Sequence, residues 1–110
     1  MVDNNTGLKA QVVALIGRDF SQELPGAEEV ADRLHMSVST LRRRLMEEKT
    51  TYQKVKDECR REAALNYMNS PQLSISDVAE LMGFTDHSAF FRSFKKWTGL
   101  TPGAYRQQHP

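Results

Sequence analysis

Two segments of this 110-residue chain carry positive charge that the rest of the chain does not share. Residues 37–61 hold eight Lys and Arg against four Asp and Glu, and residues 87–110 hold four against none. The formal net charge is only +1, so the excess is local. Cations gathered on one surface attract phosphates, and an Arg side chain can donate two hydrogen bonds to guanine. The two segments are therefore candidate sites for binding DNA.

Within these segments the cations alternate with apolar residues at helical spacing. Because a helix turns by about 100° per residue, Leu41 and Leu45 mark one inward direction, and Phe90, Phe94 and Trp97 mark another. Opposite or beside these directions lie Ser39, Thr40, Arg42 and Arg43 in the first segment, and Ser88, Phe91, Arg92, Lys95 and Lys96 in the second. Small hydroxyl side chains allow close approach to a groove, and Thr or Phe can meet a thymine methyl.

Affinity for DNA of any sequence comes largely from neutralising its phosphates. We assign this role to Arg44, Lys95 and Lys96 among the cations of the two segments. Ser37 and Thr85 lie where the two helices are predicted to begin, and free backbone N–H groups at such ends bind phosphate.

The elements that must position these residues are predicted to be helices. Apolar spacing, caps and breakers predict helices over residues 8–20, 27–34, 38–49, 51–68, 75–82, 86–98 and 102–107, and no strands. Ser37 is a predicted N-cap, and capping boxes are predicted at Thr50 and Ser74. Gly99 is predicted to end a helix in the left-handed conformation, before Thr101 caps the next. The fold class is all-α.

An internal repeat divides the chain. EVADRLHMSVSTLRRRL (29–45) aligns with DVAELMGFTDHSAFFRSF (77–94), with an offset of 48 residues before the turn and 49 after it. This alignment places Arg43 over Arg92. Each copy is a short helix, a tight turn and a second helix, which is the helix-turn-helix pattern.

The repeat predicts four parts of the chain. Residues 1–7 form a flexible tail, residues 8–50 a first helix-turn-helix subdomain, residues 51–70 a linker helix, and residues 71–110 a second subdomain. A linker of about seventeen residues would be roughly 25 Å long. Such a rod is long enough to hold two reading helices about 34 Å apart, one turn of DNA.

Residues 25–106 resemble the C-terminal DNA-binding domain of the AraC/XylS family of bacterial transcription regulators. The resemblance rests on FFRSFKKWTGLTPGAYR (90–106) and SISDVAELMGF (74–84). It implies sequence-specific binding of double-stranded DNA and regulation of transcription, with helices 38–49 and 86–98 in successive major-groove segments. It places base-reading positions on Ser39, Arg42, Arg43, His87, Ser88, Phe91 and Arg92, where His87 comes mainly from the resemblance. Members of that family usually carry an N-terminal effector-binding or dimerisation domain, so the chain is either the DNA-binding part of a longer regulator, which we favour, or a small stand-alone member. The single cysteine fits a cytoplasmic protein, and RNA polymerase is a candidate further partner.

Two residues depart from the family pattern. His35 stands in the first turn, where such proteins often have Gly, and His tolerates left-handed geometry only at a cost. Phe91 stands where a small or polar residue is more usual, and either packs on a thymine methyl or is covered by the protein.

Other classes of function find less support in the residues. The alternative is a helical protein-interaction module that docks on RNA polymerase or another regulator. No cofactor or metal is expected, because the three His share no ligand spacing and Cys59 is the single cysteine. No enzyme is expected, because Ser88 has no evident base and acid partners. No apolar run approaches the roughly 20 residues of a membrane span.

Overall fold

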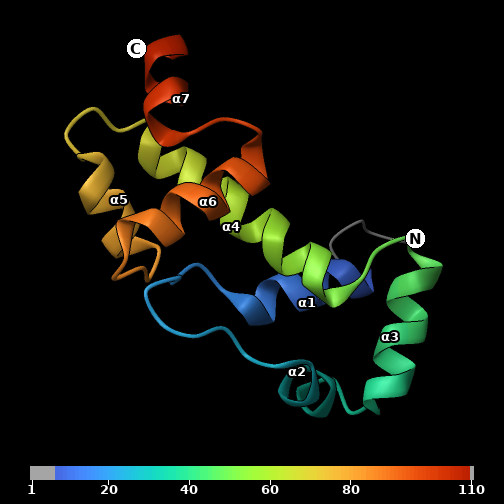
Figure 1. The fold of residues 1–110 in the computed structure, drawn as a ribbon. Coiled ribbons are helices and arrows are strands. Elements are labelled where there is room, and N and C mark those ends of the chain that lie inside the picture. The colour runs from blue at the N-terminus through green and yellow to red at the C-terminus, as the bar shows by residue number, and fades with distance from the viewer. Residues whose placement is uncertain (1–6, 110) are drawn as a thin grey trace. The chain divides into compact units, whose positions relative to one another are not determined.

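The computed structural model describes residues 7–109 and contains, in that range, seven α-helices and no strand (Figure 1). The all-α prediction is confirmed. The helices are α1 (Leu8–Ile16), α2 (Ala27–Arg33), α3 (Val38–Glu47), α4 (Tyr52–Met68), α5 (Ile75–Leu81), α6 (His87–Thr98) and α7 (Pro102–Gln108). The predicted tail, residues 1–7, lies outside the described residues except for Gly7, which precedes α1.

The chain forms two compact units. Within residues 7–109, the first unit contains Gly7–Gly17 and Leu24–Asp57, and the second contains Arg18–Glu23 and Glu58–His109. Helix α4 therefore contributes its first turns to one unit and the rest to the other.

The core of the first unit lies where α1 and α2 pack against α3. Its buried apolar side chains are Leu8, Val12, Ile16, Val30, Ala31, Leu41, Leu45, Tyr52 and Val55. Burial of a large apolar side chain contributes about 1.5–3 kcal/mol. The predicted inward direction of α3, through Leu41 and Leu45, is confirmed, because both side chains are fully buried.

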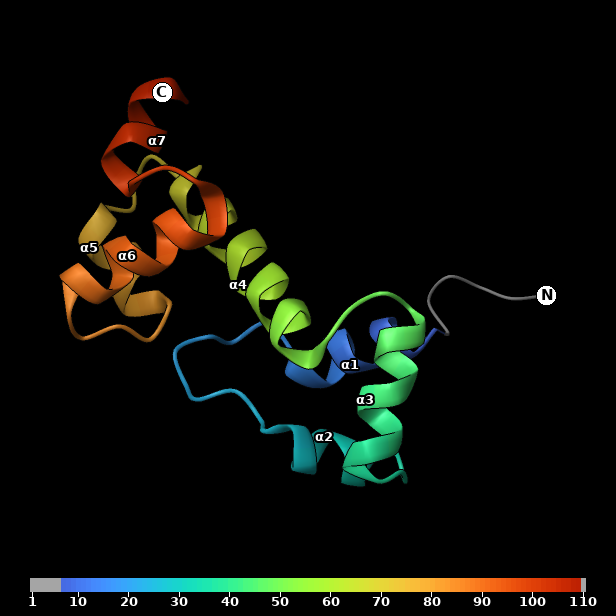
Figure 2. The same ribbon diagram turned by 45° about the vertical axis from the view of Figure 1, so that its right-hand side comes forward.

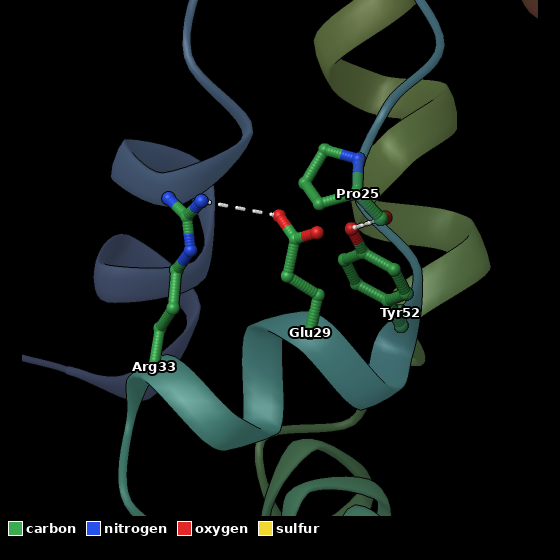
Figure 3. A network of polar contacts seen from close by, with 4 residues as sticks. All are labelled: Pro25, Glu29, Arg33 and Tyr52. Carbon is green, nitrogen blue, oxygen red and sulfur yellow. Dashed lines mark hydrogen bonds and ion pairs between the residues drawn. The ribbon is translucent and has the colours of Figure 1, made fainter.

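Polar contacts tie the start of α4 to the chain before α2 (Figure 3). The hydroxyl of Tyr52 donates a hydrogen bond to the carbonyl oxygen of Pro25 at 2.5 Å. Nearby in α2, a guanidinium nitrogen of Arg33 lies 3.3 Å from a carboxylate oxygen of Glu29. Because its ring is buried and its hydroxyl is satisfied, Tyr52 helps to position α4 relative to the first helix-turn-helix pair.

In the second unit, α5 and α6 lie side by side in both views (Figures 1 and 2), and α7 packs on α6. Aromatic rings fill this core. The ring of Phe90 lies 5.5 Å from that of Phe84 and 5.8 Å from that of Phe94, and the ring of Phe94 lies 5.9 Å from that of Tyr105. The aromatic side chains of residues 90–106 thus anchor α6 and α7 to the core of the second unit.

Side chains of α7 supply hydrogen bonds to the C-terminal end of α4 and to the residues that follow it. The guanidinium of Arg106 donates hydrogen bonds to the carbonyl oxygens of Met68 and Ser70, both at 3.3 Å. The hydroxyl of Tyr105 donates to the side-chain oxygen of Asn69 at 3.0 Å. The last carbonyls of a helix lack partners within it, so Tyr105 and Arg106 have a structural role.

Most helix ends agree with the predictions within two residues. The Ser74–Asp77 capping box, the Ser37 and Thr101 caps and the left-handed Gly99 are all confirmed. The backbone N–H of Ser74, and then its hydroxyl, hold the pKa of the Asp77 carboxyl below its usual value.

Three details at the helix ends differ from the predictions. Helix α1 ends at Ile16 rather than near Phe20, because Gly17 has a φ of 78°, and Phe20 is buried in the second unit instead. Helix α3 ends at Glu47 rather than Lys49, which has a φ of 63°. The predicted Thr50 capping box is replaced by Thr51, whose hydroxyl oxygen accepts from the backbone N–H of Lys54 at 3.1 Å.

Candidate nucleic-acid interface

The two turns that set the angle of the candidate reading helices share one backbone geometry. His35 has a φ of 57° and Gly83 a φ of 84°, so each turn contains one left-handed residue. The next residue then donates back into the preceding helix. The N–H of Met36 reaches the carbonyl of Ala31 at 3.0 Å, and the N–H of Phe84 reaches that of Ala79 at 2.9 Å. The repeat seen in the sequence is therefore a repeat of structure.

After this shared turn the two helices begin differently. The second connection, residues 82–86, is one residue longer than the first, residues 34–37. Ser37 caps α3 by accepting from the N–H of Thr40 at 3.1 Å. Asp86, rather than Thr85, caps α6 by accepting from the N–H of Ser88 at 2.9 Å. The start of α6 therefore carries the carboxylate of Asp86, next to Thr85.

The outward side of α3 is polar and rich in arginine. The side chains of Ser39, Arg42, Arg43 and Arg44 are exposed. Thr40 is half-buried, and its hydroxyl oxygen accepts from the Ser37 hydroxyl at 3.0 Å. Ser37 and Thr40 therefore form the N-terminal cap of α3. Ser39 and Arg43 lie on its outward, exposed side.

Arg43 is paired within its own helix. Its Nη1 lies 3.2 Å from Oε2 of Glu47, four residues later, and each side chain is 63% exposed. An exposed pair of this kind contributes only a few tenths of a kcal/mol to stability. The pair therefore orders the Arg43 side chain without greatly stabilising the fold.

Arg42 lies at the flank of α3 rather than on the outer ridge. It lines a cavity of about 420 Å³ in the first unit together with Met46, Tyr52 and Lys56. Met46 is 69% exposed, so apolar surface accompanies this flank. Arg42 thus has apolar neighbours, whereas Arg43 has a carboxylate.

The outward side of α6 has a different composition. Ser88, Arg92, Lys95 and Lys96 are exposed. Phe91 is 40% exposed, and its ring lies 6.4 Å from the buried ring of Phe90. The sequence left open whether Phe91 packs on a thymine methyl or is covered by the protein. The described residues leave the outer part of its ring uncovered.

His87 stands at the first position of α6 and is exposed. Its Nε2 lies 3.1 Å from the hydroxyl oxygen of Ser76 in α5. This contact holds the imidazole against the neighbouring helix, at the N-terminal end of α6.

These two helix-turn-helix units match known proteins along most of the chain. A helix-turn-helix domain family matches residues 30–108. The ornithine utilization regulator of Pseudomonas aeruginosa is 45% identical over 85 residues, which are 77% of this chain and 25% of that protein. The chain belongs to the AraC/XylS-type helix-turn-helix family. It spans between a quarter and about a third of the length of the curated regulators that it matches.

Solved structures of AraC/XylS-type domains share the fold. A DNA-binding transcriptional dual regulator from Escherichia coli K-12 superposes with a TM-score of 0.83 at 28% identity, over 99% of this chain and 97% of that one. The DNA-binding domain of the global transcriptional factor AdpA, solved in complex with a target DNA, gives a TM-score of 0.74 at 25% identity, over 94% and 93% of the two chains.

Two features of this AraC/XylS-type domain were not predicted from the sequence. Glu47 pairs with Arg43, and their spacing of four residues is the spacing of a helical ion pair. Asp86 had not been recognised as a cap, although Asp is among the preferred N-cap residues. Both signals are local and were present in the sequence.

No helix among residues 7–109 is long and apolar enough to cross a membrane. Over the same residues, no group of three or more His, Cys, Asp or Glu is arranged to hold a metal ion.

Proposed function

We propose that this domain binds specific sequences in double-stranded DNA and thereby regulates transcription. The observation that carries the proposal is that two equivalent helix-turn-helix units each present an exposed arginine at the same repeat position, Arg43 and Arg92. Family membership supports it, and so does the target DNA held by the AdpA domain, which has the same fold.

In this proposal the outer residues divide into two groups. The base-reading group is Ser39, Thr40, Arg42 and Arg43 on α3 and His87, Ser88, Phe91 and Arg92 on α6. The phosphate group is Ser37, Arg44, Thr85, Lys95 and Lys96. Phosphate contacts give affinity and orientation, while contacts to base edges give specificity. The functional parts are residues 8–50 and 71–110, joined by the linker at residues 51–70.

The wider setting is part of the same proposal. The related proteins are named as transcriptional regulators, and they are longer than this chain. We therefore place the domain in a bacterial cytoplasmic regulator with a further effector-binding or dimerisation domain. Regulation would include a contact with RNA polymerase, and the protein would have no enzymatic activity.

The test starts from selection of bound sequences out of a random DNA pool, followed by gel-shift titrations of Arg43→Ala and Arg92→Ala on the selected site. Each substitution should cost roughly 1–3 kcal/mol on that site and relax the base preference at one position. Arg33→Ala is the matched control, since Arg33 pairs with Glu29 on α2 and lies outside both reading helices.

Two results would count against the proposal. Unchanged sequence preference in both variants would remove Arg43 and Arg92 from the base-reading group. A wild-type domain that selects no sequence would instead favour the protein-interaction module.

A further inference from the structure

Glu47 shares the outer side of α3 with the residues proposed to read bases. It lies one helical turn beyond Arg43, and its carboxylate holds the Arg43 guanidinium at 3.2 Å. A negative charge at this place repels DNA phosphates. Nothing in the core requires it, because Glu47 is 63% exposed. The effect of this carboxylate is therefore to be found at the proposed DNA-binding surface and not in the core.

The pair occupies only one nitrogen of the guanidinium. Glu47 accepts its hydrogen bond from Nη1 of Arg43. A guanidinium has five N–H donors in one plane, so the edge formed by Nε and Nη2 is not used by this bond. That edge can donate two hydrogen bonds to O6 and N7 of a guanine. Reading of a guanine is therefore compatible with the ion pair.

A phosphate contact by the same arginine is opposed by the pair. Phosphate competes with the carboxylate for the charged nitrogens, because both are anions that accept bidentate hydrogen bonds from Arg. Bringing a phosphate to Arg43 also brings it near the charge of Glu47. Random DNA presents phosphates to Arg43 at every position. The carboxylate of Glu47 therefore weakens binding to random DNA more than binding to the specific site.

The second unit lacks this arrangement. The repeat offset of 49 residues that sets Arg43 over Arg92 sets Glu47 over Lys96. Helix α6 contains no acidic residue at all, and Lys95 and Lys96 follow Arg92 on its surface. The two reading helices therefore differ in charge at equivalent positions.

We infer that Glu47 is a specificity-determining residue that acts through Arg43, by keeping this arginine for a base and disfavouring its contact with phosphate. The inference rests on the proposed function. Glu47 positions Arg43 along the outer ridge of α3 and lowers the affinity of the first unit for random DNA. The second unit, without such a residue, supplies more of the affinity that is independent of sequence.

The test compares Glu47→Gln with Glu48→Gln in gel-shift titrations on the selected site and on random duplex. Both substitutions remove one negative charge, but Glu48 accepts instead from the backbone N–H of Lys9 at 3.3 Å, away from Arg43. Glu47→Gln should raise affinity for random duplex and lower the ratio of specific to random binding by about two- to five-fold. Glu48→Gln should leave that ratio within about 1.5-fold of wild type.

A double-mutant cycle with Arg43→Ala separates the positioning role from a direct one. In the Arg43→Ala background, Glu47→Gln should no longer change the ratio. An equal effect with and without Arg43 would overturn the inference, because Glu47 would then act on the DNA directly. An unchanged ratio in Glu47→Gln, with wild-type site preference intact, would overturn it as well and leave the proposed function standing. A wild-type domain without site preference would overturn both.

Discussion

The outer residues of α3 and α6 differ in chemistry at equivalent places. Under the offset of 49 residues, Arg42 corresponds to Phe91, Met46 to Lys95 and Glu47 to Lys96. The first helix thus carries arginines with a carboxylate among them, and the second carries an aromatic ring beside two lysines. Because bases and phosphates are recognised by different groups, we expect the two helices to contribute unequally to specificity and to affinity.

Phe91 is expected to recognise a thymine methyl, since its ring is 40% exposed on the outer side of α6. Phe91→Ala should weaken binding to the selected site by about four-fold, on the scale of one buried methyl group at ~0.8 kcal/mol. Replacing the contacted thymine by uracil removes only the methyl group and should weaken wild-type binding by a similar factor. If uracil at every site position is tolerated as well as thymine, Phe91 makes no such contact.

Lys95 is expected to contact phosphate, because it is exposed on α6 one turn from Arg92. Lys95→Ala should weaken binding to all sequences alike and reduce the slope of log affinity against log salt by about one. Titrations at several salt concentrations, on the selected site and on random duplex, measure this slope. A wild-type slope in the variant would remove Lys95 from the phosphate group.

At the scale of elements, each helix-turn-helix angle depends on one left-handed residue. Gly83 is suited to this conformation, and a Cβ added there would lie 2.6 Å from the carbonyl oxygen of Phe20. His35 adopts the same region in the first unit despite its side chain. The two units therefore have the same turn geometry. Only the turn of the first unit holds a residue other than glycine in the left-handed conformation, and it is the more strained of the two.

This difference predicts opposite effects of substitution. His35→Gly should stabilise the domain by about 0.5–1 kcal/mol, because it removes the left-handed penalty. Gly83→Ala should destabilise it by more than about 1 kcal/mol, through the same penalty and the clash with Phe20. Urea unfolding measures both changes. Gly103→Ala is the control, since Gly103 lies within α7 with open space around its Cβ position, and it should not destabilise the fold.

At the scale of the whole molecule, one chain contains two helix-turn-helix units. Helix α4 is continuous over 17 residues and contributes to both units. A simple helix-turn-helix protein obtains its two reading helices by dimerisation. Here the internal repeat supplies both, so a single chain should recognise a bipartite site.

The selected DNA site should accordingly contain two half-sites about 10 bp apart. Arg43→Ala should relax base preference in one half-site only, and Arg92→Ala in the other. Insertion of about five base pairs between the half-sites should abolish the gain in affinity that comes from binding both half-sites at once. The insertion turns one half-site to the opposite side of the duplex. Relaxation of the same half-site by both variants would contradict two-unit reading.

Local patterns in the sequence were enough to predict much of this domain. The spacing of Leu41 and Leu45 predicted which side of α3 is buried, and hence that Arg43 is exposed. The caps at Ser37, Ser74 and Thr101 were predictable because their hydrogen bonds join residues three apart. The Arg43–Glu47 pair was equally accessible, because its partners are four residues apart.

The remaining features depend on residues that lie far apart in the chain. Phe20 belongs to the core of the second unit although it follows a helix of the first, and Arg106 completes α4 across 38 residues. Tyr52 bonds to Pro25 across 27 residues. Neighbouring residues alone therefore determined most of the helices and caps and the exposed arginines, through short-range hydrogen bonds and helical periodicity. Only the tertiary structure decided which helix ends are completed by distant side chains, because those contacts form when packing brings separate elements together.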